Sequence, residues 1–367
     1  MKTIITDFDD FSPSYPIESI APLDDILFVD IETTGLSPRS SNLYIIGAVY
    51  HAEGTWHAIQ WLADKYEEEC LILEAFLTFV KSYKVLIHFN GNRFDIPFLQ
   101  AKCETFDLED SFKNLEGIDL YKRIVSYKNI LGLLDCKQKT IEQFLGIYRE
   151  DTFSGRELIS YYHDYVISGS EESYKLFMLH NLEDLKGMLP LLSILSYTDL
   201  FTKAPKVMGA KASYYLNSDK TRCQEIILKL RLEAALPRPI SFHAMGCYFS
   251  GEGVDASLKI PLYEEEMKFF YSGYKNYYYL PAEDMAMHKS VATYVDKEHR
   301  VQATASNCYT RKQSFYLPQW EPLFTPFFKR DYASKEIFFE LSDEFKKNRS
   351  GFSMYAAHIL QVMSRNA

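Results

Sequence analysis

The sequence lacks most features that would assign it to a specialised class of protein. Its six cysteines are widely scattered and form no Cys-x-x-Cys pair, which excludes a zinc knuckle or a disulfide framework. No apolar run approaches the roughly 18 to 20 residues of a membrane span. Residues 1–10 are acidic and lack the basic and apolar regions of a signal peptide. We therefore expect a soluble protein of the reducing cytoplasm.

The length of 367 residues favours two domains. Charge is distributed unevenly between the two halves of the chain. Residues 1–200 carry 17 Lys/Arg and 32 Asp/Glu, a net charge of −15, whereas residues 201–367 carry 23 and 18, a net charge of +5. A basic, aromatic-rich half attracts a phosphate backbone and stacks bases, although a net charge of this size also serves solubility alone. The acidic half repels nucleic acid unless cations neutralise its carboxylates.

The first 200 residues alternate between strand and helix patterns. Apolar runs predict four strands, at 26–31, 43–51, 56–62 and 85–89. The first three of these form an antiparallel meander. Amphipathic helices are predicted at 67–83, 94–106, 140–145, 156–166 and 171–195, with a distortion at Pro190. This order predicts an α/β domain at 1–200 with an RNase H-like mixed sheet flanked by helices.

Residues 201–367 are predicted to form a smaller α+β domain that binds substrate, of a fold that the sequence does not reveal. Lys203–Lys211 resembles a linker and Pro237–Pro239 a break, and strand patterns follow at 271–280, 300–309 and 336–345 before a helix at 352–362. Two weaker features lie here. Asp284 and His288 share helical spacing, and Tyr277–Tyr279 could stack bases, but structural roles are favoured for both.

Carboxylates follow two of the predicted strands. Asp30 and Glu32 are two residues apart at the end of the first strand, so their side chains share a face. Two carboxylates on one face repel each other unless a divalent cation lies between them, although such pairs are commonly only solvated. Asp95 follows the turn at Asn90 and Gly91, where it opens a helix; an acid favoured by the helix dipole is the alternative interpretation.

A histidine and a further carboxylate lie inside the long helix. His180 and Asp184 are four residues apart and therefore on one face. The neighbouring apolar stripe leaves a buried structural histidine as an equal alternative. Taken together, four carboxylates and a histidine in this order are the groups required for two-metal phosphodiester hydrolysis. That reaction uses two divalent ions roughly 4 Å apart and a general base beside the attacking water.

The sequence resembles the DEDD superfamily of 3′-5′ exonucleases, which have an RNase H-like fold, and within it the YprB-type RNase H-like family. The similar segments are FVDIETTGL at 28–36, HFNGNRFDIPFL at 88–99, GIDL at 117–120, KTIEQFLGIYRED at 139–151 and HNLEDL at 180–185. The resemblance implies that two Mg²⁺ or Mn²⁺ ions are held by Asp30, Glu32, Asp95 and Asp184. It also implies that His180 positions or deprotonates the water, and that the 3′-terminal nucleotide lies along Thr33, Thr34, Gly35, Leu36 and Asn90.

One spacing departs from this pattern. In DEDD enzymes with a catalytic histidine, the histidine usually precedes the last aspartate by five residues, whereas His180 precedes Asp184 by four. On a helix this difference rotates the side chain by about 100°. Asp119, in the GIDL segment, is interpreted as a positional residue.

These features predict a metal-dependent 3′-5′ exonuclease that acts on single-stranded DNA or RNA, with no membrane association. Two alternatives remain at this point. The first is a non-catalytic nucleic-acid-binding module with an RNase H-like fold, and the second is a structure-specific endonuclease.

Overall fold

A computed structural model describes residues 1–8, 14–150, 153, 155–216 and 218–367. The chain forms two compact units. The first comprises Met1–Asp199 together with Ala234–Arg238, and the second comprises Leu200–Glu233 and Pro239–Ala367. No helix among these described residues is both long and apolar enough to cross a membrane.

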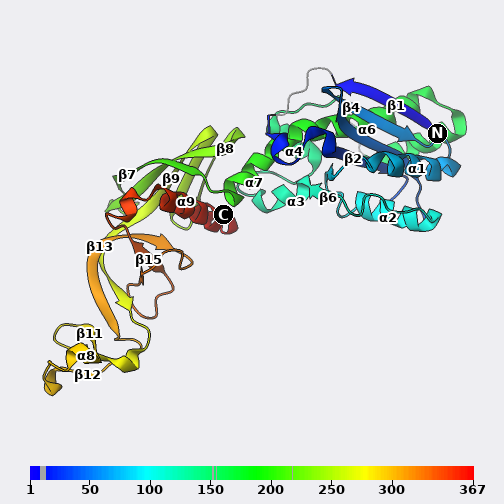
Figure 1. Ribbon diagram of the computed structural model, residues 1–367. Coiled ribbons are helices and arrows are strands. Elements are labelled where there is room, and N and C mark those ends of the chain that lie inside the picture. The colour runs from blue at the N-terminus through cyan, green and yellow to red at the C-terminus, as the bar shows by residue number, and fades with distance from the viewer. Residues whose placement is uncertain (9–13, 151–152, 154, 217) are drawn as a thin grey trace. The chain divides into compact units, whose positions relative to one another are not determined.

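The first unit is built on a six-stranded mixed sheet (Figure 1). In spatial order its strands are β1 (Lys2–Phe8), β4 (Thr55–Leu62), β3 (Leu43–Ala52), β2 (Ile26–Thr33), β5 (Val85–His88) and β6 (Glu116–Asp119). The first four pair antiparallel, and β2–β5 and β5–β6 pair parallel. The predicted meander and fourth strand are confirmed, whereas the sequence interpretation missed β1 and β6.

Helices cover both faces of this sheet. On one face, α1 (Glu69–Val80) and α2 (Asp95–Phe106) bury a core that includes Leu27, Val29 and Ile31 of β2. On the other face, α5 (Gly155–Ser168) and α6 (Glu171–Leu191) bury Tyr44, Ile45 and Leu62. The remaining helices are α3 (Leu120–Ile124), α4 (Gln138–Leu145) and α7 (Leu195–Thr202). This is the predicted RNase H-like arrangement.

Pro190 marks the end of the long helix. The sequence predicted one distorted helix to Leu195, but α6 ends at Leu191, and a 3₁₀ turn at Leu192–Ile194 leads into α7. Proline has no N–H group to continue the helical hydrogen bonds, so the chain changes helix type here.

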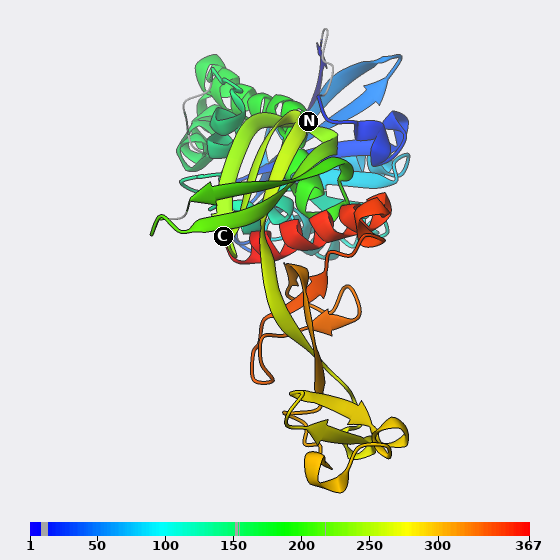
Figure 2. The same ribbon diagram turned by 90° about the vertical axis from the view of Figure 1, so that its left-hand side faces the viewer.

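The second unit is mostly β-structure. Its larger sheet has the order β14 (Phe327–Phe328), β15 (Ile337–Glu340), β13 (Tyr309–Gln319), β9 (Cys247–Phe270), β8 (Arg222–Ala244) and β7 (Lys206–Leu216). Helix α9 (Arg349–Arg365) contacts β7 and β9. Figure 2 shows a small sheet of β11 (Met285–His288), β10 (Tyr277–Leu280) and β12 (Val301–Gln302), with α8 (Lys289–Ala292), at the end of the β9–β13 ribbon.

Several expectations for this half are wrong. The predicted linker at Lys203–Lys211 is largely strand β7, because Val207 packs into the core while its neighbours face outward. The break at Pro237–Pro239 lies within β8. Asp284 and His288 do not share a helix: Met285–His288 is a strand, and Asp284 lies in the turn before it with φ 48°. The predicted closing helix is confirmed by α9.

Candidate active site

The two acidic side chains of strand β2 share one face of the sheet. Leu27, Val29 and Ile31 enter the core beneath α1 and α2, so the alternating residues Asp30 and Glu32 face the other way. There they meet α6: Asn181 Nδ2 lies 2.8 Å from Asp30 Oδ2, and His180 Nε2 lies 3.8 Å from Glu32 Oε1. Two carboxylates are thereby held side by side against one helix.

Asp95 reaches the same place from the turn that follows β5. The side chain of Asp119 shapes this turn, since its two oxygens accept hydrogen bonds from the backbone N–H groups of Asn90 (2.9 Å) and Asn92 (3.2 Å). Asp95 is then the first residue of α2, and its Oδ1 accepts a hydrogen bond from the N–H of Ile31 at 3.3 Å. Asp119 therefore acts on the loop that leads to Asp95, in keeping with a positional role.

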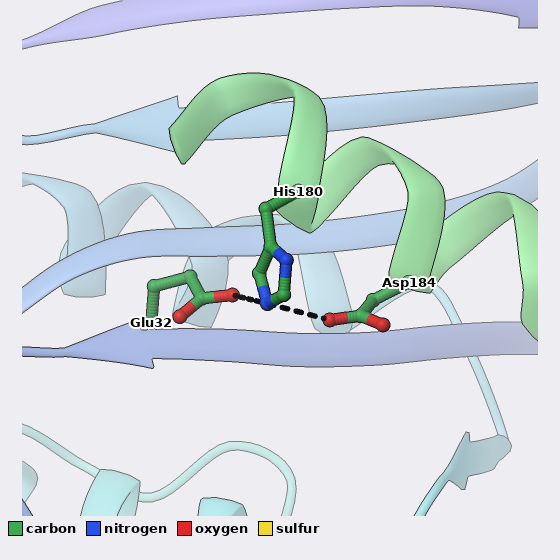
Figure 3. A group of neighbouring side chains, drawn as sticks. All are labelled: Glu32, His180 and Asp184. Atoms are coloured by element: carbon green, nitrogen blue, oxygen red, sulfur yellow. Dashed lines mark ion pairs between the residues drawn. The ribbon is translucent and has the colours of Figure 1, made fainter. Parts of the chain in front are cut away.

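His180 lies between Glu32 and Asp184 (Figure 3). Its Nε2 is 3.3 Å from Asp184 Oδ2, and one potential ligand atom from each of the three residues lies within 4.8 Å of the others. His180 and Glu32 are buried, and Asp184 is partly buried. The four-residue interval therefore does not turn the imidazole away from the acidic cluster.

The carboxylates of this cluster disfavour one another's charge. Burial raises the pKa of Asp30 well above its ordinary value, and the negative charges of Asp184, Glu32 and Asp95 raise it further. Burial also raises the pKa of Asp95 to about 7, with added contributions from Asp119 and Asp184. Such a site favours a positive charge among the carboxylates.

The chemistry of the donor set fits hard divalent cations. Carboxylate oxygens suit Mg²⁺ and Mn²⁺, and the described part of the cluster contains no thiolate. Tyr44 places a fully buried hydroxyl beside Glu32. After burial, the charge of Glu32 contributes most to the raised pKa of this hydroxyl. It is a donor close to a candidate ligand.

Arg149 is a further member of the site that sequence reasoning missed. Its guanidinium is buried and pairs with both Asp184 Oδ1 and Glu142. Gly187 makes room for this network, since a Cβ there would lie 2.2 Å from a Glu142 oxygen. Arg149 falls within a segment that resembles the DEDD pattern, but nothing in that pattern indicates which carboxylate it would contact.

The residues predicted to contact a nucleotide begin with the last residue of β2, Thr33, and continue into the loop after it, apart from Asn90. Thr33 Oγ1 donates to the carbonyl of Gly35 at 2.9 Å, and Thr34 Oγ1 accepts from the N–H of Asn42 at 2.8 Å. Both hydroxyls therefore shape the loop. Leu36 is 85% exposed and presents apolar surface to solvent.

A family model matches the part of the chain that contains this site. Residues 27–196, which include all five predicted catalytic residues, match the family model RNase_H_2 of the RNase_H superfamily. No curated protein matches the chain.

Solved structures show more distant similarity. The family B DNA polymerase of Pyrobaculum calidifontis is 16% identical, with 48% of this chain and 25% of that chain covered and a TM-score of 0.40. The zinc-bound complex of E. coli ExoI with ssDNA is 12% identical, with 57% and 55% covered and a TM-score of 0.28. The chain thus spans between a quarter and about half of the length of these proteins.

Proposed function

We propose that this protein is a metal-dependent 3′-5′ exonuclease that hydrolyses the phosphodiester bonds of single-stranded DNA or RNA. The observation that carries the proposal is that Asp30, Glu32, Asp95 and Asp184 lie close enough to act on one another's charge, with His180 beside Glu32 and Asp184. Carboxylates packed together, two of them with raised pKa values, are unfavourable by themselves and become favourable when cations bind.

In this proposal the four carboxylates hold two Mg²⁺ or Mn²⁺ ions. Bound cations of this kind lower the pKa of an attacking water and stabilise the charge of the leaving oxygen. The residues contribute position and proton transfer. Asp30 and Glu32 come from one strand, Asp95 from a helix start and Asp184 from a second helix, so the ligands approach from different directions.

His180 is proposed as the general base. Its Nε2 faces the oxygens of Glu32 and Asp184, which orient the ring toward the cluster. A histidine so placed can take a proton from water bound beside these carboxylates. The 3′-terminal nucleotide is proposed to lie along Thr33–Leu36 and Asn90, with the exposed Leu36 against a nucleobase.

The second unit is proposed to bind the rest of the nucleic-acid strand. It contains a groove of about 1310 Å³ whose lining includes Lys206, Lys229, Arg231 and Tyr248. Pairing of β7 with β8 sets Lys206 directly opposite Arg231, so these two cations share a face of the sheet. Cations and an aromatic ring along a groove are suited to a phosphate chain and its bases. Glu252 and Asp255 also line the groove, and Asp255 pairs with Arg231.

The experiment that tests the proposal uses 5′-labelled DNA and RNA oligonucleotides with Mg²⁺, Mn²⁺ or EDTA. An exonuclease gives products shortened from the 3′ end, requires the metal and stops at a blocked 3′ terminus. Cleavage of a 3′-blocked strand would instead indicate an endonuclease. Binding without metal-dependent cleavage would indicate a non-catalytic module. Asp30→Asn is the control for contaminating nucleases.

A further inference from the structure

A hydrogen-bonded pair of amides behind the acidic cluster has no role in the chemistry described above. We propose that Asn181, oriented by Gln60, is a positioning residue for Asp30: it occupies one carboxylate oxygen so that the other is presented to a divalent cation. This inference rests on the proposed function, because it assigns Asp30 to a metal site.

The sheet places these residues in one row. Asp30 on β2 is the register partner of Gly47 on β3, and Gly47 is the partner of Gln60 on β4. Asn181 on α6 lies over this row and is fully buried. A Cβ at Gly47 would lie 2.4 Å from Asn181 Oδ1, so the glycine allows the amide to approach the sheet.

The orientation of both amides follows from a single carbonyl. Gln60 Nε2 lies 3.1 Å from the carbonyl oxygen of Met178, which can only accept a hydrogen bond. The same nitrogen lies 2.8 Å from Asn181, so the Asn181 atom that faces it must be the oxygen. Asn181 Nδ2 is therefore directed to Asp30 Oδ2, at 2.8 Å. The hydrogen-bond network therefore allows only one orientation of the Asn181 amide, the one in which its nitrogen donates to Asp30.

The other two aspartates of the cluster also accept hydrogen bonds from protein groups. Asp95 Oδ1 accepts from the backbone of Ile31, and Asp184 Oδ1 accepts from Arg149. Asp30 and Asp95 therefore each have one oxygen bound by a protein donor, whereas Asp184 contacts Arg149 through Oδ1 and His180 through Oδ2. Fixing a ligand through a second hydrogen bond restricts its rotation and favours a defined coordination geometry.

The competing explanation is that Gln60 and Asn181 only satisfy buried polar groups where α6 packs on the sheet. Such a role affects the stability of the protein and leaves its affinity for a metal unchanged. The two roles therefore predict different results for metal binding by folded variants.

The experiment is calorimetric titration of the full chain with Mn²⁺, with urea unfolding to establish that each variant is folded. Asn181→Leu keeps the approximate side-chain volume and removes the donor, so we expect Mn²⁺ to bind about 10- to 100-fold more weakly. Gln60→Leu is expected to give a smaller loss. The double variant should lose no more than Asn181→Leu within about two-fold, because Gln60 acts through Asn181.

Asn42→Leu is the matched control. Asn42 Nδ2 also donates to a carboxylate, that of Glu69 at 3.2 Å, but this carboxylate lies outside the acidic cluster. Its loss should leave Mn²⁺ affinity within two-fold of wild type. If Asn181→Leu does not fold, Asn181→Ser replaces it with the same expectation, because the shorter side chain places no donor at Asp30.

Failure of this inference is distinguishable from failure of the proposed function. Unchanged Mn²⁺ affinity in the folded Asn181 variant would overturn the positioning role while leaving the metal site intact. Absence of Mn²⁺ binding by the wild type would overturn the proposed metal site itself.

Discussion

Each of the two units contains a buried or partly buried aspartate that the sequence singles out, but their surroundings are opposite. Asp284 in the second unit accepts hydrogen bonds from the hydroxyls of Tyr279 and Tyr309, and these bonds lower its pKa. Asp30 in the first unit has carboxylates as charged neighbours, and burial together with their charges raises its pKa. The negative charge of Asp284 is therefore stabilised by hydrogen bonds within the protein, whereas that of Asp30 favours a bound cation.

The strongest test of this contrast exchanges each aspartate for asparagine. Asp30→Asn should lower the rate of oligonucleotide cleavage by about 10³-fold or more, because a lost metal ligand removes several kcal/mol of transition-state stabilisation. Asp284→Asn should leave the rate unchanged and lower the stability by about 1 kcal/mol, because a neutral amide oxygen accepts weaker hydrogen bonds from the two tyrosines and makes no ion pair with Arg311. Single-turnover cleavage and urea unfolding measure the two effects. Cleavage by Asp30→Asn within ten-fold of wild type would contradict the comparison.

His180 tests whether the first cluster is a reaction site as well as a metal site. His180→Ala should slow the chemical step by about 10² to 10⁴-fold if the imidazole is the general base. Mn²⁺ affinity should hardly change. A strong loss of Mn²⁺ affinity would make His180 a ligand, and a rate within a few-fold of wild type would assign the base role elsewhere.

The raised pKa of Asp95 predicts an unusual pH dependence of stability. Its folded-state pKa is about 7, whereas an unfolded aspartate titrates near 4. Between these values the folded chain retains a proton that the unfolded chain has released. The free energy of unfolding of the metal-free protein should therefore fall by a few kcal/mol as pH rises from about 4 to about 7.

Urea unfolding at pH 5 and pH 7.5 measures this dependence. Asp95→Asn should weaken it, and Mn²⁺ should stabilise the wild type more at pH 7.5. Asp284→Asn should leave the dependence intact, since the lowered pKa of Asp284 places its titration at lower pH. Stability of the metal-free wild type that rises over this range would disprove the assigned pKa direction.

The smallest expected effect concerns the groove of the second unit. Reversing two of its cations with Lys206→Glu and Lys229→Glu should raise KM for a strand of roughly 20 nucleotides and reduce the salt dependence of binding by about two phosphate contacts. Turnover of a dinucleotide should not change. The double reversal Lys346→Glu and Lys347→Glu in the same unit is the matched control. Equal KM values for both double variants would remove the groove from the substrate path.

The parts of the fold that follow from local pattern were predictable from sequence. The apolar run before Asp30 predicts strand β2, and period-two alternation then places Asp30 and Glu32 on one face. The apolar patterns at 43–51 and 56–62 likewise predict β3 and β4. In the second unit, β7 has no alternation of buried and exposed residues, because Val207 is its one buried side chain.

Features that depend on contacts between distant segments were not predictable. Asn181 meets Asp30 and Gln60 across 151 and 121 residues of sequence, and Arg149 meets Asp184 across 35. No local pattern assigns partners to a buried amide or a buried arginine. Spacing also misled in both directions: the four-residue interval at His180 does not remove it from the site, and the same interval at Asp284 and His288 spans no helix.

The central claim is that the acidic cluster of the first unit is a dinuclear metal site. Calorimetric titration of the wild type with Mn²⁺ tests it most directly, with Asp30→Asn and Asp284→Asn titrated in parallel. We expect two Mn²⁺ ions per chain for wild type and for Asp284→Asn, and the loss of at least one ion in Asp30→Asn. Absence of binding by the wild type, or equal stoichiometry and affinity in all three proteins, would contradict it.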